Sequence, residues 1–217
     1  MAALETNAKP KSIVGWGLLL VLLYGILVGT SLGLQWGRTA AERDRTWPSE
    51  SYDEVYFHRP VIETFAAQLP TPNLADYDSA TTPGYHLVGA VLYRLGGIGL
   101  ARLFFAACAL LLPLLLYRAV VPRLGIGAGL LLASLLCLSN YVIAAATWIT
   151  TDNLALLFVA FSLVSMLAAL DCEDWRWLLL ATLAVLAALL VRQVHLWLCG
   201  PLFISALMFR SRDLRGV

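Results

Sequence analysis

Residues 13–34 read IVGWGLLLVLLYGILVGTSLGL, a run that contains no charged side chain. At 1.5 Å of rise per residue, a helix of this length crosses the roughly 30 Å of hydrocarbon in a bilayer. Five further apolar blocks follow it, at residues 103–121, 124–147, 153–170, 177–191 and 194–209. The sequence therefore predicts an all-α, polytopic membrane helical bundle with about six spanning helices.

The composition agrees with a membrane protein. Of the 217 residues, 60% are hydrophobic and 13% are charged, whereas about a quarter of a soluble domain is charged. This excludes a soluble Rossmann or barrel enzyme and a disordered chain, and the four cysteines show no paired spacing of a disulfide scaffold. The net charge of +1 gives no reason to expect nucleic acid as a partner, so membrane lipids are the expected surroundings.

The polar residues are concentrated in one long stretch after the first helix, which carries eight of the fourteen acidic residues and five prolines. We expect a single integral membrane domain over residues 1–217. Its parts would be a first helix at 13–34, a large outer loop at 35–101, the remaining helices at 102–209 and a cytoplasmic tail at 210–217.

Arginine positions predict the orientation, because cationic residues favour the cytoplasmic ends of short loops. They place both termini inside and the long loop outside. Within this loop, an apolar pattern over residues 53–69 predicts a short amphipathic helix on the membrane surface. Residues 85–95 are apolar but too few to cross, so they would lie in the interface or dip into it.

The first helix also carries a stripe of small residues. Gly25, Gly29 and Gly33 recur every four residues and therefore share one helix face. Such stripes let the backbone of another helix approach closely. The sequence thus predicts a helix contact at this stripe.

With this topology, the outer ends of several elements converge on one membrane face. A carboxylate beside arginines suits a reaction in which a hydroxyl is deprotonated and a phosphate leaves, with the carboxylate as base and an arginine on the phosphate. The polar residues brought to this face are Asp53, Glu54, His58, Asp76, Asp78, Arg102, Asp152, Arg192 and His195.

The acidic residues of this set also have structural or metal-binding interpretations. Ser51 and Glu54 fit a helix capping box. Glu54 and His58, four residues apart on one helix face, could hold a metal ion together with Asp76 or Asp78, which is a weak signal.

Three residues at predicted helix ends have simpler alternatives as well. Asp152 could cap the helix that follows it. Arg192 and His195 could extend from a helix end to the membrane interface without touching a ligand.

Several motifs, taken in order, resemble a known family. They are YDEVYFH at residues 52–58, DSATTPGY at 78–85, Thr151-Asp152, and Arg192-Gln193 followed by Trp197. Together they resemble the N-terminal half of a GT-C superfamily glycosyltransferase. The most similar family is the dolichyl-phosphate-glucose α-1,2-glucosyltransferases, and the resemblance extends over residues 13–209.

The resemblance implies an enzyme that moves a hexose, glucose in that family, from a polyprenyl (dolichyl-type) phosphate donor. The transfer would invert the anomeric centre, and the acceptor would be a glycan or a lipid-linked glycan on the non-cytoplasmic face. No cofactor is required by this resemblance, and a divalent metal stays open as an alternative. The Ala- and Leu-rich composition favours a bacterial inner membrane over the endoplasmic reticulum.

The family motifs also assign roles to residues of this chain. Asp53 matches the catalytic base, and Glu54, next to it in the same motif, is the second expected catalytic residue. Arg102 and Arg192 match basic positions that would hold the lipid phosphate. The other expected substrate-binding residues are His58, Asp76, Asp78, Thr82, Tyr85, Asp152, Gln193 and His195.

Two departures from the family pattern leave alternatives open. His195 replaces an asparagine of the family, which bears on the identity of donor and acceptor. Because the resemblance matches only the first half of family members, a non-catalytic or truncated subunit that needs a membrane protein partner is the alternative function.

Overall fold

The computed structural model describes residues 10–36, 52–77 and 79–213. These residues form helices and loops and contain no strand, so the expected all-α bundle is confirmed for the described part of the chain. The elements are α1 (Pro10–Trp36), η1 (Glu54–His58), α4 (Arg59–Gln68), α5 (Gly84–Cys137), α6 (Asn140–Thr147), α7 (Asp152–Cys172), α8 (Trp175–Val191), η2 (Gln193–Leu198) and α9 (Cys199–Asp213).

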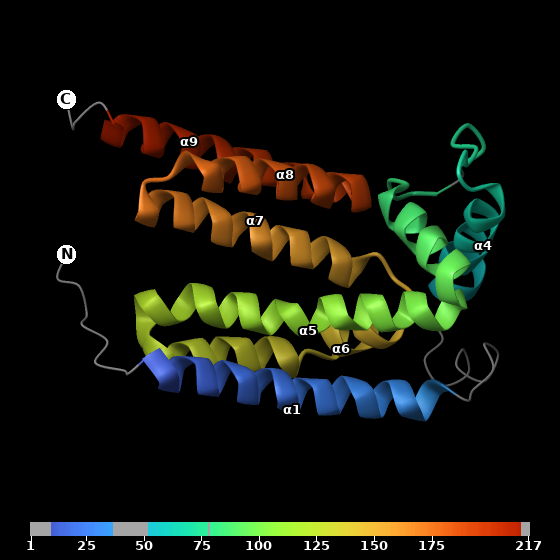
Figure 1. The fold of residues 1–217 in the computed structure, drawn as a ribbon, viewed down its shortest axis with the longest axis horizontal. Helices are drawn as coiled ribbons and strands as arrows, with labels where there is room; N and C mark the ends of the chain where they lie inside the picture. The colour runs from blue at the N-terminus through green and yellow to red at the C-terminus, as the bar shows by residue number, and fades with distance from the viewer. Residues whose placement is uncertain (1–9, 37–51, 78, 214–217) are drawn as a thin grey trace.

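Helix α5 consists of three consecutive helical segments. The backbone leaves helical geometry at Gly96 and Gly97, and again at Gly125. Residues 84–95 therefore form a short segment beside α4, and the chain reverses direction at Gly125 so that residues 126–137 run back along residues 98–124 (Figure 1). Gly125 has φ +86° and ψ 170°, a conformation essentially limited to glycine, which explains the residue type at this turn.

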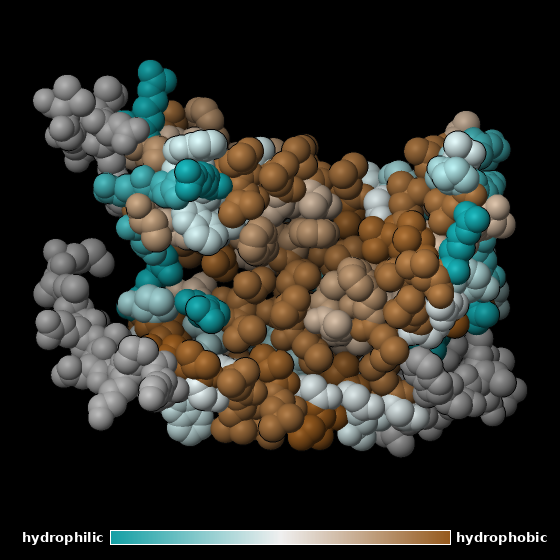
Figure 2. Space-filling model, in the orientation of Figure 1, coloured by the Kyte–Doolittle hydropathy of each residue, from teal (hydrophilic) through white to brown (hydrophobic). Residues whose placement is uncertain are grey.

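The long helices run side by side and can account for the expected membrane crossings. Among the described residues, four helical stretches are long and apolar enough to cross a bilayer by length and composition: α1, α5, α7, and η2 continued by α9. The reversal at Gly125 places residues 98–124 in one expected pass and residues 126–137, followed by α6, in another. The apolar α8 is slightly shorter at 17 residues. In Figure 2 hydrophobic residues fill the middle of the molecule, and hydrophilic residues gather at its two ends. The chain is an integral membrane protein.

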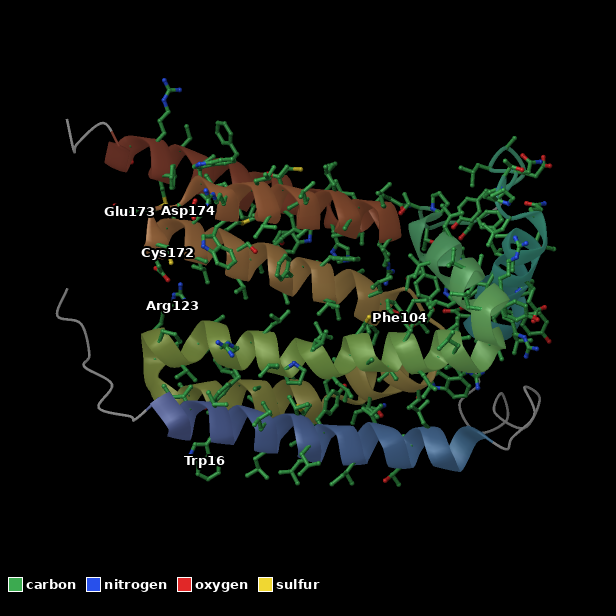
Figure 3. The ribbon with its side chains drawn as sticks, viewed as in Figure 1. Trp16, Phe104, Arg123, Cys172, Glu173 and Asp174 are labelled. Carbon is green, nitrogen blue, oxygen red and sulfur yellow. The ribbon has the colours of Figure 1, made fainter. Side chains whose placement is uncertain are left out.

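One end of the bundle contains the start of α1, the turn at Gly125 and the end of α9 (Figure 1). At this end Glu173 adopts a left-handed conformation that terminates α7, and the Asp174 carboxylate accepts a hydrogen bond from the Arg176 backbone N–H to cap α8. Arg123, Glu173 and Asp174 lie close to one another here (Figure 3). We call this the terminal end, and α4 lies at the opposite end.

The two short helices expected within the long loop are present. The helix expected over residues 53–69 is confirmed as η1 followed by α4, and residues 84–95 form the short apolar helix expected over 85–95. Ile62 of α4 is completely buried and packs in one apolar cluster with Tyr85, Phe105 and Ile149. The loop helix is therefore anchored on the bundle by a core directly beneath it.

Two expectations were wrong. Gly25, Gly29 and Gly33 face open space within the described structure, and α1 packs through the adjacent face of Leu20, Tyr24 and Val28. This face holds larger side chains that bury more apolar area, so the close glycine contact is not made. The block 124–147 was also expected as one helix, but the chain leaves helical geometry at Ser139, where α6 begins.

Candidate active site

A cavity of about 550 Å³ opens at the end of the bundle opposite the termini. Asp53, Phe57 and His58 form one wall, from η1 and the residue before it. The other walls come from the loop before α5, from α6, from the start of α7 and from the residue after α8. These lining residues are Ser79, Ala80, Thr81, Tyr141, Thr151, Asp152 and Arg192.

The loop before α5, which forms one wall of the cavity, is fixed to the end of α8 by hydrogen bonds. The Thr82 hydroxyl donates a hydrogen bond of 2.7 Å to the Leu189 carbonyl, and the Gln193 side-chain amide donates to the Ala80 carbonyl. At Gly84 the backbones come so close that a Cβ would collide with the Leu190 carbonyl oxygen. Thr82 and Gln193, both expected to bind substrate, therefore brace the wall and do not line the cavity.

Asp152 and Arg192 form an ion pair within the cavity wall. Asp152 is the first residue of α7, and the Arg192 guanidinium donates to its Oδ1 atom. Asp152 is thus not the N-cap, which is Thr151, and its charge lies at the positive end of the α7 dipole. The Arg192 side chain remains 35% exposed and has further N–H donors, so it can still bind an anion in the cavity.

A second ion pair lies in the protein interior. The Arg102 guanidinium donates to Glu54 Oε1, and the Ile149 backbone N–H donates to Glu54 Oε2 over 3.3 Å. Both side chains are buried, and neither lines the cavity. The expected roles of Arg102 on the lipid phosphate and of Glu54 in catalysis do not fit these positions, because each charge is committed to the other inside the fold. The pair joins the loop helix to α5.

Three rings extend inward from the cavity wall in a hydrogen-bonded series. His58 Nδ1 lies 3.0 Å from His86 Nε2, and His86 Nδ1 lies 2.8 Å from the Tyr77 hydroxyl. Burial, and secondarily the positive charge of Arg192, lowers the pKa of His58 to about 4, so this imidazole is neutral at neutral pH. Sequence reasoning missed His86 and Tyr77, because neither stands in a motif or at a helical spacing from His58.

Other expected site residues lie elsewhere. Tyr85 is fully buried and stacks on Phe105, with ring centroids 4.4 Å apart. Asp76 accepts a 2.6 Å hydrogen bond from the Asn73 side chain, in a separate hollow beside α4. His195 lies in η2 away from the cavity lining. Asp78, like Ser51 of the capping-box alternative, lies outside the described residues.

Among residues 10–36, 52–77 and 79–213, no group of three His, Cys, Asp or Glu side chains lies close enough to hold a metal ion. The alternative metal site with Glu54 and His58 therefore finds no third ligand in this part of the chain. Of the two third ligands considered from the sequence, Asp76 is bound by Asn73 in its own hollow, and Asp78 lies outside the described residues. The chemistry that the described cavity offers is that of carboxylates, a guanidinium and a neutral imidazole.

The described structure is thus a helical membrane bundle with a carboxylate- and arginine-lined cavity at one end. A family model described as dolichyl-phosphate-mannose-protein mannosyltransferase matches residues 83–215, which is more than half of the chain. The chain therefore belongs to the dolichyl-phosphate-mannose-protein mannosyltransferase family. No curated protein and no solved structure matches it.

Membership of this family makes the protein a glycosyltransferase that uses a polyprenyl-phosphate sugar donor. The GT-C part of the resemblance is thus confirmed, whereas the glucosyltransferase family within it stays a prediction. The matched residues include Asp152 and Arg192 but begin after the loop motif, so Asp53 and His58 lie outside the match.

Proposed function

We propose that this chain transfers a hexose from a polyprenyl-phosphate donor to a glycan or lipid-linked acceptor on the non-cytoplasmic side of the membrane. One observation carries the proposal. A cavity with two carboxylates and an accessible guanidinium lies at the end of the bundle opposite the termini. Because the positively charged residues predict that the termini lie in the cytoplasm, the cavity end is expected on the outer face. A bilayer-embedded donor can present its headgroup at this depth while its tail stays in the hydrocarbon.

The reaction uses Asp53 as the general base. Its carboxylate takes the proton from the acceptor hydroxyl while that oxygen attacks the anomeric carbon and the bond from this carbon to the phosphate oxygen breaks. Attack from the opposite side of the sugar inverts the anomeric centre. Arg192 donates to the phosphate oxygens and stabilises the charge that the departing polyprenyl phosphate gains. Asp152 holds the guanidinium in position at the start of α7.

The donor sugar is a hexose with two candidates. Glucose is the sugar implied by the motifs of residues 52–58 and 78–85, and mannose is the sugar in the name of the matched family. A panel of polyprenyl-phosphate glucose, mannose and galactose, offered to the purified chain in lipid, separates them. We further propose that the chain resides in a bacterial inner membrane, which its Ala- and Leu-rich composition favours over the endoplasmic reticulum.

The first experiment measures sugar transfer by the chain and by its Asp53→Asn variant. Asp171→Asn is the matched control, because it makes the same chemical change at an exposed carboxylate on the terminal end. We expect the cavity variant to lose activity by about 10²-fold or more and the control to keep it. The same assay after chelation tests the expectation that no metal cofactor is required.

Two results would contradict the proposal. If Asp53→Asn folds and transfers sugar at the native rate, another group is the base. If the well-folded native chain transfers none of the sugars, the alternative of a non-catalytic subunit gains support, and co-purification with another polytopic membrane protein then tests that alternative directly.

A further inference from the structure

The ring series at the cavity has both of its ends in the cavity wall. It begins at His58, passes through His86 and reaches the Tyr77 hydroxyl, as described above. This hydroxyl lies 3.4 Å from the Thr81 hydroxyl and 3.3 Å from the Thr82 carbonyl oxygen. His58 and Thr81 both line the cavity, whereas His86 is completely buried. The series is therefore a buried path between two points of one cavity.

Each ring in this series can be neutral in two complementary arrangements. In the first, Tyr77 donates to the Thr81 hydroxyl, His86 Nδ1–H donates to Tyr77, and His58 Nδ1–H donates to His86 Nε2. This leaves a lone pair on His58 Nε2. In the second, Tyr77 donates to His86 Nδ1, His86 Nε2–H donates to His58 Nδ1, and His58 carries its proton on Nε2. A neutral imidazole has one donor and one acceptor nitrogen, so the tautomers of the two rings are linked.

We propose that His58, His86 and Tyr77 form a proton chain that takes a proton from the cavity at His58 Nε2 and releases one at Thr81. This inference rests on the proposed role of Asp53 as base. After Asp53 has taken the acceptor proton, its O–H bond breaks, directly or through a cavity water, as the His58 Nε2–H bond forms. The chain thereby returns Asp53 to its ionised form before the next sugar is transferred.

The protons along the chain balance. The Nδ1 proton of His58 passes to His86 Nε2, and the Nδ1 proton of His86 passes to the Tyr77 oxygen. The original Tyr77 proton passes to the Thr81 oxygen, and the Thr81 proton passes to cavity water. One proton enters and one leaves. The chain returns to its first arrangement when Nε2–H gives its proton to cavity water and the Tyr77 end takes one back.

Burial explains why a chain serves better here than one histidine. A lone His58 would become an imidazolium inside the protein and beside Arg192, and this environment lowers its pKa to about 4. Passing the Nδ1 proton onward lets His58 accept a proton at Nε2 without gaining charge. The desolvation cost of a buried cation is then avoided.

The first test is independent of sugar transfer. In the chain labelled with ¹⁵N-histidine, we expect a nitrogen–nitrogen coupling across the hydrogen bond between His58 Nδ1 and His86 Nε2. Tyr77→Phe removes only the hydroxyl and keeps the ring that stacks on Phe65, with centroids 5.6 Å apart. We expect this variant to shift the tautomer ratio of His58, although Tyr77 hydrogen-bonds to His86 and not to His58.

The second test is the transfer rate. We expect Tyr77→Phe to lower kcat by about 10- to 100-fold with KM unchanged, at or below the lower end of general acid–base effects. Its proton inventory in mixtures of H₂O and D₂O should change from curved to linear, which a purely structural role would not cause. Tyr93→Phe is the control, because Tyr93 packs in the same apolar clusters and its hydroxyl makes no hydrogen bond within the described residues.

The outcomes separate this inference from the proposed function. If His58 tautomers and the proton inventory are the same in Tyr77→Phe as in the native chain, the proton chain is overturned, and loss of activity in Asp53→Asn still supports the proposed function. If the native chain transfers no sugar, the proposed function fails, and the tautomer shift alone decides whether the rings are coupled.

Discussion

The Glu54–Arg102 pair shows how strongly one residue can depend on another in the interior. Removing one member of a buried pair leaves an uncompensated charge, which costs about 3–5 kcal/mol. We therefore expect Arg102→Met to lower the free energy of unfolding by about this amount. Glu54→Gln together with Arg102→Met should restore part of it, because the remaining charge is then removed. Chemical unfolding in detergent measures both changes.

The control for this prediction is the pair at the terminal end. Arg123 donates to Asp171, whose side chain is 59% exposed. Exposed pairs contribute about 0–1 kcal/mol, so Arg123→Met should have little effect on unfolding. If Arg102→Met and Arg123→Met lower the free energy of unfolding equally, burial of the Glu54–Arg102 pair is not the reason for the loss.

His58 predicts how stability depends on pH. Its pKa is about 4 in the folded protein against an ordinary value of 6.5, so between these values the unfolded chain binds the proton more readily. The free energy of unfolding should therefore be unaffected by His58 above pH 6.5. It should fall by up to about 3 kcal/mol as the pH is lowered towards 4, because the unfolded chain then binds a proton that the folded protein does not. His58→Asn keeps a hydrogen-bonding group near the Nδ1 position but cannot titrate. Thermal unfolding measured between pH 4 and 6.5 should show a smaller change of unfolding temperature with pH in the variant than in the native chain. The same dependence on pH in both would contradict the prediction.

The sequence predicted part of the candidate site at this scale. Asp53, His58, Asp152 and Arg192 stand in motifs, and the structure brings them to one cavity. Their catalytic roles stay predictions. The roles expected for Arg102 and Glu54 fail on burial, because a charge pattern along the chain does not indicate which charges neutralise each other inside the fold. His86 has no partner nearby in sequence, since its contact with His58 spans 28 residues.

At the scale of elements, the turn at Gly125 gives a direct test. An alanine there would have to adopt a conformation with φ +86°, which costs about 1–3 kcal/mol. We expect Gly125→Ala to destabilise the hairpin within α5 by this amount. Gly127→Ala is the matched control, because it lies two residues away with open space at its Cβ and should be neutral or stabilise by about 0.5–1 kcal/mol. Unfolding midpoints of the two variants compare them, and equal midpoints would contradict the assigned strain.

The helices themselves were predictable because apolar length is a local property. Five of the six apolar blocks fall on helical segments, and the loop helix follows its apolar pattern, whereas block 124–147 is interrupted before α6. The break at Ser139 and the face on which α1 packs were not predictable, because both depend on neighbours. Leu20, Tyr24 and Val28 are as regularly spaced as the glycines, and only the position of α5 decides between the two faces.

At the scale of the whole molecule, the orientation in the membrane is the central prediction. Cys172 is exposed at the terminal end, and Asp76 is exposed near the cavity end. We compare two chains, one with Cys172 as its single cysteine and one with all native cysteines replaced and Asp76→Cys introduced. A membrane-impermeant maleimide added to intact cells should label the second chain and not the first. The reverse pattern would place the cavity in the cytoplasm and contradict the proposed function.

The two ion pairs also constrain how the protein is made. Glu54 meets Arg102 48 residues later, and Asp152 meets Arg192 40 residues later. A ribosome releases residues in order, so the start of α7 enters the bilayer before its guanidinium partner has been synthesised. Until α8 and Arg192 have been translated, the Asp152 carboxylate therefore lacks the guanidinium that pairs with it in the folded protein. The cavity wall is therefore complete only after residue 192 has been synthesised.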